Sequence, residues 1–598
     1  MNTHTHRKNT FCILFLVIVL LQIIASPLQV SSQIRNTSLI SVSPDEINDL
    51  VSQMQYLPID EPLQYTDLEM EMNFNKPLFI TKAAAKEDTE RLFYLLENGY
   101  AGYGYFNKDN LFQEGKNAIL SEIETKIVLT SSDLSTIFYK HLNFLHDCHL
   151  KIGDQIYKTH LDYWYNTEYE FTKENQEYTL TFEDKVYKVT TINNQSPDDF
   201  LHPSFNSEGE SIYQIGMLSR TSPEISELLT ESNGETERWS VTLENTKHVY
   251  SELYMEKVIG GVPVVRIRTF SDQHIKYITE FLECATKYRD SPCLIVDIRG
   301  NGGGNTAYAR QWITRYTGEA PVLPQIYTEL VSETSMMGRS NYFAHSLNLY
   351  PELESQRYDL KAEEFKGYAE KIENGENSIH WSDYYIPNPR TISNNRTLIV
   401  LMDKYVGSAA EGFLSYLQLV DNVVFVGENS GGALTFGQLT RHMLPNSRIL
   451  VDLPISLNIF VDLEYREEKG FYPDVWVPSM DALNYAVAAV RYGSIETSDA
   501  FRDEVSEVDF IPETNPVSSN LPQLIPILFG LFYGVVVVYF NRKRDYKIFL
   551  IGGIVAILIG AFLPINQELG LIFVFTGVEY FGIAIYKWIN DRRNRQEK

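Results

Sequence analysis

The chain has 598 residues, 44% of them hydrophobic and 22% charged, and 51 Lys and Arg against 78 Asp and Glu give a formal net charge of −27. This globular composition excludes wholesale disorder, and so acidic a chain lacks the basic surface that nucleic acid binding requires. The 4 cysteines include no Cys-x-x-Cys pair, which excludes a disulfide scaffold and a structural zinc ribbon.

The first 33 residues have the pattern of a secretory leader. Arg7 and Lys8 precede an apolar run over residues 11–25, and the small residues Ala25 and Ser26 follow it. We predict a signal peptide or uncleaved leader over residues 1–33, so that the chain after it leaves the cytoplasm.

Residues 34–155 form a predicted helical region, because residues 83–96 and 116–143 have helical apolar spacing with few Gly or Pro. The region ends in the segment Phe144-Leu-His-Asp-Cys-His149, whose imidazoles are candidate general bases. His146, Cys148 and His149 are alternatively metal ligands, but neighbouring side chains point in divergent directions and no His-Glu-x-x-His spacing exists. We therefore predict no metal and no cofactor.

Two patterns follow in the middle of the chain. Residues 156–257 form a predicted β-rich module, because aromatic and β-branched residues alternate with charges over residues 157–192. Residues 258–493 form a predicted α/β core with parallel strand pairing. Its expected strands are 262–267, 293–298, 397–402 and 423–426, and its expected helices are 272–287, 305–316 and 408–419.

The first polar turn of the predicted core is the glycine-rich segment Arg299-Gly-Asn-Gly-Gly-Gly304, between a strand and a helix. Glycines there let backbone N–H groups face an anion at a helix start. A phosphate loop is excluded because no Gly-Lys-Ser/Thr follows, and a dinucleotide fingerprint fails because Asn305 replaces its last glycine. An oxyanion hole and a simple tight turn remain.

The second turn places Ser408 before the helix 408–419, where a serine is either a nucleophile or an ordinary N-cap residue. A third polar turn carries Glu467 and Glu468, and a carboxylate there either orients an imidazole or is simply solvated.

The C-terminal end has the pattern of a membrane anchor. Residues 494–520 form a predicted acidic stalk, and three apolar stretches follow within residues 521–587. Each is about 18 to 20 residues long, which suits a ~30 Å hydrocarbon layer. Because the loop 541–547 and the tail 588–598 are basic, both are predicted to be cytoplasmic. We therefore expect a multi-pass protein of the cell membrane with its catalytic domain on the extracytoplasmic side.

Four motifs in this order carry a family resemblance: Asp-Ile-Arg-Gly-Asn-Gly-Gly, Gly-Ser-Ala-Ala-Glu, Val-Gly-Glu-Asn-Ser-Gly-Gly and Glu-x-x-Gly-x-x-Pro-Asp. Together they resemble the serine peptidases of the C-terminal processing peptidase and tricorn core family over residues 258–492. The resemblance implies a crotonase/ClpP-like α/β core, and the β-rich module vaguely resembles the PDZ-like modules of this family.

The resemblance also implies residue roles. Ser408 matches the nucleophile, and the backbone N–H groups of Gly303 and Ala409 match the oxyanion donors. The processing branch activates its serine with a lysine about one helix downstream, but residues 427–441 contain no lysine. The tricorn-like branch pairs serine with histidine, which makes His149 the base and Glu467 the residue that orients it.

The function expected from this resemblance is a membrane-anchored extracytoplasmic serine endopeptidase that cleaves peptides or proteins through an acyl-enzyme. Its expected partners are a peptide or protein substrate and, through the C-terminal spans, a lipid bilayer. Retinoid-binding relatives share this core without peptidase action, so the alternative is a catalytically silent, membrane-tethered binding module.

Overall fold

The computed structural model describes residues 42–58, 69–72, 74–157, 160–245, 250 and 252–505. All of them belong to the first of two compact units, Met1–Glu513; the second unit is Thr514–Lys598. The predicted leader and the predicted membrane spans lie outside the described residues. In the part of the chain that is described, no helix has the length and apolar character needed to cross a membrane.

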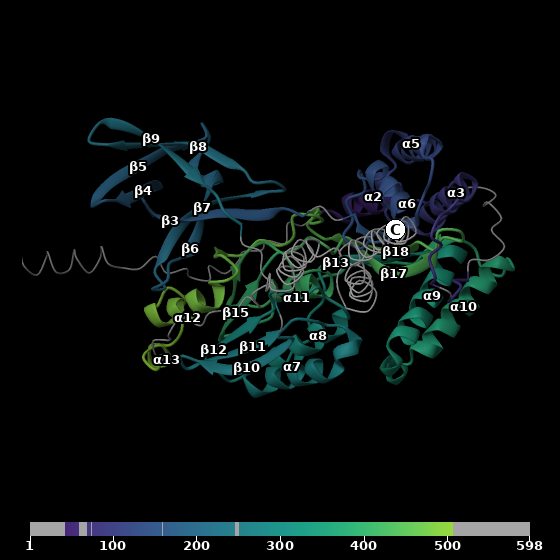
Figure 1. Cartoon of the computed structure of the whole chain (residues 1–598). Helices are drawn as coiled ribbons and strands as arrows, with labels where there is room; N and C mark the ends of the chain where they lie inside the picture. The colour runs from purple at the N-terminus through teal and green to yellow at the C-terminus, as the bar shows by residue number, and fades with distance from the viewer. Residues whose placement is uncertain are drawn as a thin grey trace, which may run out of the picture. The chain divides into compact units, whose positions relative to one another are not determined.

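A sheet of six strands forms the centre of the core (Figure 1). Its order is β10-β11-β12-β15-β16-β19, and every pair is parallel except β10–β11. The predicted α/β core with parallel pairing is confirmed. The strands are β10 (Tyr254–Ile259), β11 (Val262–Ile267), β12 (Cys293–Asp297), β15 (Thr397–Met402), β16 (Val423–Gly427) and β19 (Val475–Trp476).

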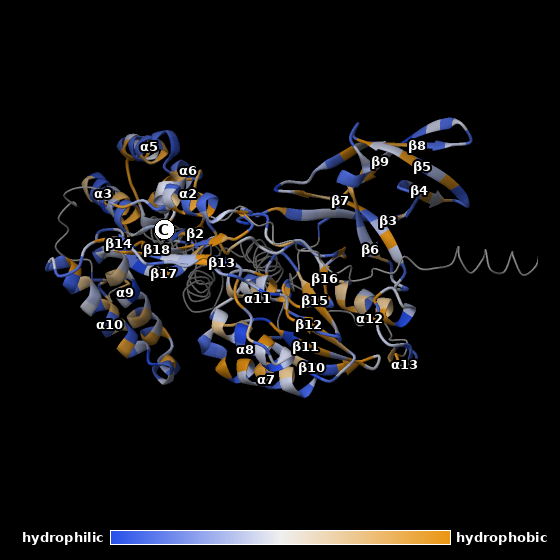
Figure 2. Cartoon of the chain, turned by 180° about the vertical axis from the view of Figure 1, so that it is seen from behind, coloured by the Kyte–Doolittle hydropathy of each residue, from blue (hydrophilic) through white to orange (hydrophobic). Residues whose placement is uncertain are grey.

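Helices cover both faces of this sheet. One face packs against α7 (Ile275–Lys287), α8 (Thr306–Thr317) and α11 (Ala409–Leu417), and the other packs against α12 (Ala482–Tyr492). Because both faces are covered, strands such as β12 are buried along their whole length and are coloured hydrophobic in Figure 2. The carboxyl ends of neighbouring parallel strands lie at one edge, which brings the turns after β12 and β15 together.

A second sheet joins the N-terminal region to the core. Its order is β14-β13-β18-β1-β2, with β17 on the other side of β18. Lys151 of β1 pairs with Asp452 of β18, so the predicted N-terminal region and core share this sheet. The strands are β1 (Lys151–Ile152), β2 (Gln155–Ile156), β13 (Gln325–Val331), β14 (His380–Trp381), β17 (Phe436–Met443) and β18 (Leu450–Phe460).

The N-terminal region is helical, as expected, but one predicted helix is wrong. Residues 116–143 form two helices, separated at residues 126–130. Thr130 starts the second helix through a capping box with Asp133, which fixes a new helix start inside the apolar pattern. The helices are α2 (Pro44–Met54), α3 (Lys82–Gly99), α4 (Tyr103–Phe106), α5 (Leu111–Thr125) and α6 (Ser131–His141), with a 3₁₀ turn at Lys108–Asn110.

A helical pair not predicted from the sequence lies between β13 and β14 in the chain. It comprises α9 (Glu333–Leu349) and α10 (Tyr358–Glu373), joined by the 3₁₀ segment Pro351–Gln356, and α9 packs on β17. At the other end of the core, Ile495 and Val505 are buried and α13 (Asp499–Arg502) lies between them. The first residues of the predicted stalk therefore pack against the core.

The β-rich module is a single sheet of seven antiparallel strands in the order β6-β7-β3-β4-β5-β8-β9, with its own apolar cluster. Among the described residues 160–245 there is no α-helix, only a 3₁₀ turn at Pro197–Asp199, so the PDZ-like character stays a prediction. The strands are β3 (Asp162–Glu174), β4 (Glu177–Phe182), β5 (Lys185–Ile192), β6 (Leu201–Phe205), β7 (Ser211–Ser219), β8 (Glu224–Ser232) and β9 (Glu235–Thr242).

Candidate active site

Ser408 occupies the N-cap position of α11 in a strained backbone conformation. Its φ of 52° and ψ of −122° lie outside the common regions for a residue with a side chain. The side chain makes no capping hydrogen bond to the helix. Ser408 is therefore not used as an ordinary N-cap serine, and its hydroxyl is directed to another partner.

That partner is His149, which comes from the N-terminal region. The two residues are 259 positions apart in the chain, and His149 Nε2 lies 3.1 Å from Ser408 Oγ, within hydrogen-bond reach. Burial lowers the pKa of His149 to about 4. The imidazole is therefore neutral at pH 7 and has a lone pair available for the serine proton.

The other nitrogen of this imidazole is oriented by none of the described residues. His149 Nδ1 is buried and makes no hydrogen bond to any residue that the structure describes. Glu467 was the residue expected to orient the imidazole, but its two oxygens accept hydrogen bonds from backbone instead. Cys148 N–H donates to Oε1 at 3.2 Å, and Thr435 N–H donates to Oε2 at 3.0 Å. Glu467 is thus hydrogen-bonded to the backbone next to His149 and not to the imidazole ring.

Asp147 holds the same loop from the other side. Its Oδ1 accepts the backbone N–H of His149 at 2.8 Å and of Leu150 at 3.3 Å, and its Oδ2 accepts the Tyr100 hydroxyl at 2.9 Å. Two buried carboxylates, Asp147 and Glu467, therefore fix consecutive N–H groups of the loop that carries the base. Tyr100 had no distinguishing signal in the sequence, because it lies in the loop between two helices, far from any motif.

These carboxylates have perturbed pKa values. Burial raises the pKa of Asp147 to about 6. Burial, and then the nearby charge of Asp147, raise the pKa of Glu467 well above its usual range. Close buried carboxylates are not easily ionised together, so the pair holds a proton up to a higher pH than separate carboxylates would.

The glycine-rich turn lies against the nucleophile. A Cβ built on Gly303, whose φ is 99°, would lie 2.8 Å from Ser408 Cβ and 2.8 Å from Ala409 N. The turn and the start of α11 are therefore packed together, as the oxyanion prediction requires. The N–H of Gly303, however, donates to Asn301 Oδ1 at 2.9 Å, so an oxyanion would compete with that bond. Ala409 is the first residue of α11, where N–H groups face away from the helix.

Glu411 organises the loop on the far side of the nucleophile. It lies in the first turn of α11, and its side chain is buried. It accepts hydrogen bonds from Ser430 Oγ at 2.6 Å, from Gly432 N at 2.8 Å and from Ala433 N at 2.6 Å. The spacing of Glu411, three residues after Ser408, is that of a capping box. The hydrogen-bond partners of Glu411 lie instead in the loop after β16, and the local sequence does not indicate them.

The remaining candidate residues of the sequence have separate partners. His146 Nδ1 contacts Glu468, whereas Cys148 Sγ lies 3.3 Å from Gly432 O. The described residues include no group of three His, Cys, Asp or Glu side chains that could hold a metal ion. Lys404 is buried and contacts Asp162 Oδ1 at 3.1 Å, away from the Ser408–His149 pair.

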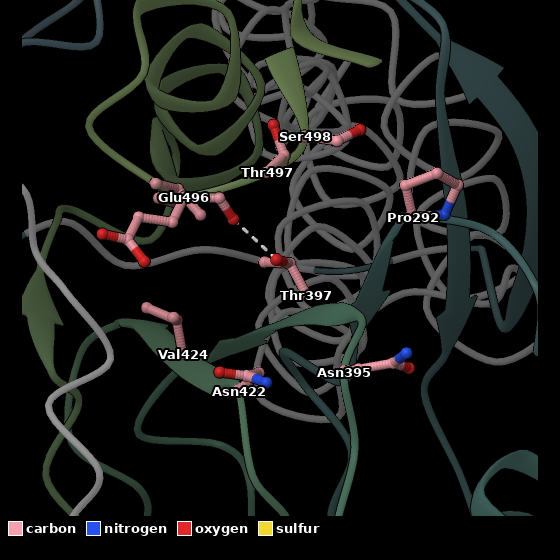
Figure 3. Close-up of a pocket in the computed structure, with 9 residues that line it drawn as sticks. Pro292, Asn395, Thr397, Asn422, Val424, Glu496, Thr497 and Ser498 are labelled. Atoms are coloured by element: carbon pink, nitrogen blue, oxygen red, sulfur yellow. Dashed lines mark hydrogen bonds between the residues drawn. The ribbon is translucent and has the colours of Figure 1, made fainter. Parts of the chain in front are cut away.

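A cavity of about 280 Å³ lies elsewhere, at the opposite ends of the central strands (Figure 3). Thr397 starts β15 and Val424 lies early in β16, and both line it. Because the Ser408 turn follows the carboxyl end of β15, this cavity is not part of the candidate active site.

A strained serine at a helix start, in hydrogen-bond contact with a half-buried, neutral histidine, is the arrangement of the serine hydrolases. A comparison with protein families gives the class more closely: residues 261–477 match the model of Peptidase family S41. Residues 261–477 are therefore similar to Peptidase family S41, and the chain is a serine-type peptidase. The matched residues include Gly303, Ser408, Ala409 and Glu467, whereas His149 precedes them.

Solved structures with a similar chain trace include peptidases. Mature CPAF in complex with lactacystin is 15% identical, covering 69% of this chain and 99% of that chain, with a TM-score of 0.38. The photosystem II D1 C-terminal processing protease is 13% identical over 72% and 99%, with a TM-score of 0.30. The tricorn protease is 11% identical over 71% and 37%, with a TM-score of 0.30. No curated protein matched the chain.

Proposed function

We propose that this protein is an endopeptidase that cleaves peptide or protein substrates through an acyl-enzyme on Ser408, with His149 as general base. The observation that carries the proposal is the 3.1 Å contact between His149 Nε2 and Ser408 Oγ, made by residues 259 positions apart. A contact over that separation at the start of a helix is not a product of local turn geometry. It joins a candidate base in the N-terminal region to a candidate nucleophile within the residues that match a peptidase family.

In the first step, Ser408 Oγ attacks the peptide carbonyl while His149 Nε2 accepts its proton. The neutral state of His149 at pH 7 makes this transfer possible without prior deprotonation. The imidazolium then gives the proton to the leaving amine, and water attacks the acyl-enzyme with the same residue as base. Asp147 and Glu467 hold the loop of the base through its backbone, so the imidazole stays near Ser408.

The tetrahedral oxyanion needs N–H donors beside Ser408. Ala409 offers its N–H at the positive end of α11, where a developing negative charge is stabilised. In the proposal Gly303 is the second donor. It becomes available when its N–H exchanges Asn301 Oδ1 for the oxyanion.

The proposal includes a location: a multi-pass protein of the cell membrane with the peptidase domain on the extracytoplasmic side. It is supported by the leader pattern of residues 1–33 and by the apolar stretches within residues 521–587. The basic loop 541–547 and the basic tail 588–598 give the orientation.

The test uses the full chain in detergent, with casein and a peptide library as substrates and a fluorophosphonate as a serine-directed probe. The expected result is hydrolysis and labelling that both disappear in Ser408→Ala. His149→Ala should lower kcat by orders of magnitude, whereas the matched variant His146→Ala, which alters a residue bound to Glu468, should not. Absence of labelling and of hydrolysis in the wild-type chain would instead favour the silent binding module.

A further inference from the structure

Tyr250 lies between the last strand of the β-rich module and the first strand of the core, outside every motif of the sequence. It follows β9, which ends at Thr242, and precedes β10, which begins at Tyr254. Its hydroxyl donates a short hydrogen bond of 2.6 Å to Asp403 Oδ2. Asp403 is fully buried and follows directly on β15, five residues before the nucleophile.

The other oxygen of Asp403 connects the two turns of the active site. Asp403 Oδ1 accepts the N–H of Gly300 at 2.9 Å and the N–H of Tyr405 at 3.1 Å. Gly300 belongs to the glycine-rich turn, and Tyr405 belongs to the turn that carries Ser408. One carboxylate therefore fixes the spacing between the oxyanion side and the nucleophile side of the site.

The ring of Tyr250 holds the same position by packing. It lies directly against Gly300, where a Cβ would clash with the ring. The guanidinium of Arg268 lies over the ring, 3.7 Å from its centre, and donates to the carbonyl of Arg299. The ring thus contacts both a cation and the glycine-rich turn, with its hydroxyl directed at Asp403.

The glycine-rich turn and the Ser408 turn also contact each other directly. The N–H of Gly407 donates to Asn301 O at 3.0 Å, and Gly303 packs against Ser408. If Gly300 moved relative to Asp403, the backbone of the two turns would therefore shift with it. The oxyanion donors and Ser408 would then change their positions relative to each other. Errors well below 1 Å at such positions lower the rate of a peptidase without preventing substrate binding.

We propose that Tyr250 and Asp403 are positioning residues of the peptidase site: the Tyr250 hydroxyl fixes the Asp403 carboxylate, which sets the distance between the glycine-rich turn and the Ser408 turn. Neither residue touches the reacting atoms. The proposal rests on the proposed function, since it concerns the rate of the same serine chemistry.

The test compares Tyr250→Phe with a matched control. Tyr250→Phe keeps the contacts of the ring with Arg268 and Gly300 and removes only the bond to Asp403. Tyr254→Phe removes a similar bond, from Tyr254 to Glu256 Oε2 at 3.0 Å, which has no link to either turn. We expect kcat of Tyr250→Phe to fall about tenfold or more with KM within about twofold, as for a small misplacement of catalytic groups, and Tyr254→Phe to behave as wild type.

The readouts separate positioning from folding. Rates are normalised to the folded fraction from circular dichroism, and the fluorophosphonate labelling rate should fall in parallel with kcat. Asp403→Asn, which keeps an acceptor for the two N–H groups, should retain more activity than Asp403→Ala. An unchanged kcat in Tyr250→Phe, or a loss that normalisation removes or that Tyr254→Phe shares, would overturn the proposal. An inactive wild-type chain would overturn the proposed function instead.

Discussion

Gly303 offers a sharp test of how closely the two catalytic turns are packed. In Gly303→Ala the new methyl would lie 2.7 Å from Gly407 O, 2.8 Å from Ala409 N and 2.8 Å from Ser408 Cβ. Ordinary contacts of a Cβ begin at 3.4 Å, so each of these falls 0.6 to 0.7 Å short. The three atoms belong to the nucleophile turn itself, so the turn must move away from the glycine-rich turn.

The size of the effect follows from that displacement. Moving reacting groups by about 1 Å costs on the order of 100-fold in rate, and a shift of 0.6 to 0.7 Å therefore predicts a loss of kcat of roughly 10- to 100-fold. The φ of 99° at Gly303 adds strain for a residue with a Cβ, on the order of 1–3 kcal/mol in unfolding free energy. Because this strain lowers the free energy of unfolding, the Tm should fall by a few degrees.

Gly302→Ala is the matched control, because a Cβ on Gly302 meets no atom within 4 Å and Gly302 is exposed. Peptide hydrolysis by the full chain in detergent, with the Tm measured by differential scanning fluorimetry, gives both quantities. Equal activity of Gly303→Ala and Gly302→Ala would refute the reasoning, because it would mean that the two turns are not packed as described.

Three further predictions concern other parts of the site. Because burial lowers the pKa of His149 to about 4, the base itself stays neutral from about pH 7 to pH 5, so a loss of kcat/KM in that range should come from Asp147, whose pKa burial raises to about 6, and should be absent in Asp147→Asn; half-maximal activity near the free imidazole value of ~6.5 that persists in Asp147→Asn would contradict this. Lys404→Ala should destabilise the fold by about 1–3 kcal/mol, because it removes one of two partners of the partly buried Asp162 and leaves His160 as the other, while kcat per folded molecule stays near that of wild type; a specific loss of kcat would give Lys404 a catalytic role. A cysteine replacing the exposed Ser378 should react with an impermeant thiol reagent in intact cells, above the background from the native Cys148; reaction only after lysis would reject the extracytoplasmic location.

The positions of most core elements could be predicted from the sequence because their signals are local. The strand Thr397–Met402 and the strand Val262–Ile267 have the predicted bounds, since both are short runs of β-branched and aliphatic residues between polar turns. Alternation of such strands with helices implies parallel pairing. That pairing makes the turn after β12 and the turn after β15 neighbours, whereas the prediction that Gly303 and Ser408 share one site came from the family resemblance.

Two helical features differ from the prediction. The break between α5 and α6 depends on the Thr130–Asp133 capping box inside an apolar pattern that continues on both sides. The helical pair α9–α10 was missed because α9 has little amphipathic contrast: polar residues such as Ser335 and Asn341 are buried in it together with apolar ones.

The catalytic contact itself was decided by tertiary structure. His149 reaches Ser408 because β1 pairs with β18, and because Asp147 and Glu467 hold the backbone of its loop. The sequence supplied the histidine and, through a family resemblance, its role, but not these partners. A carboxylate has no local preference between an imidazole and a backbone N–H, so only the packing of buried groups shows that Glu467 binds Cys148 and Thr435. For the same reason, the bonds from Tyr250 to Asp403 and from Asp403 to the two turns join residues that no spacing rule relates, and they become visible only when the folded chain brings them together.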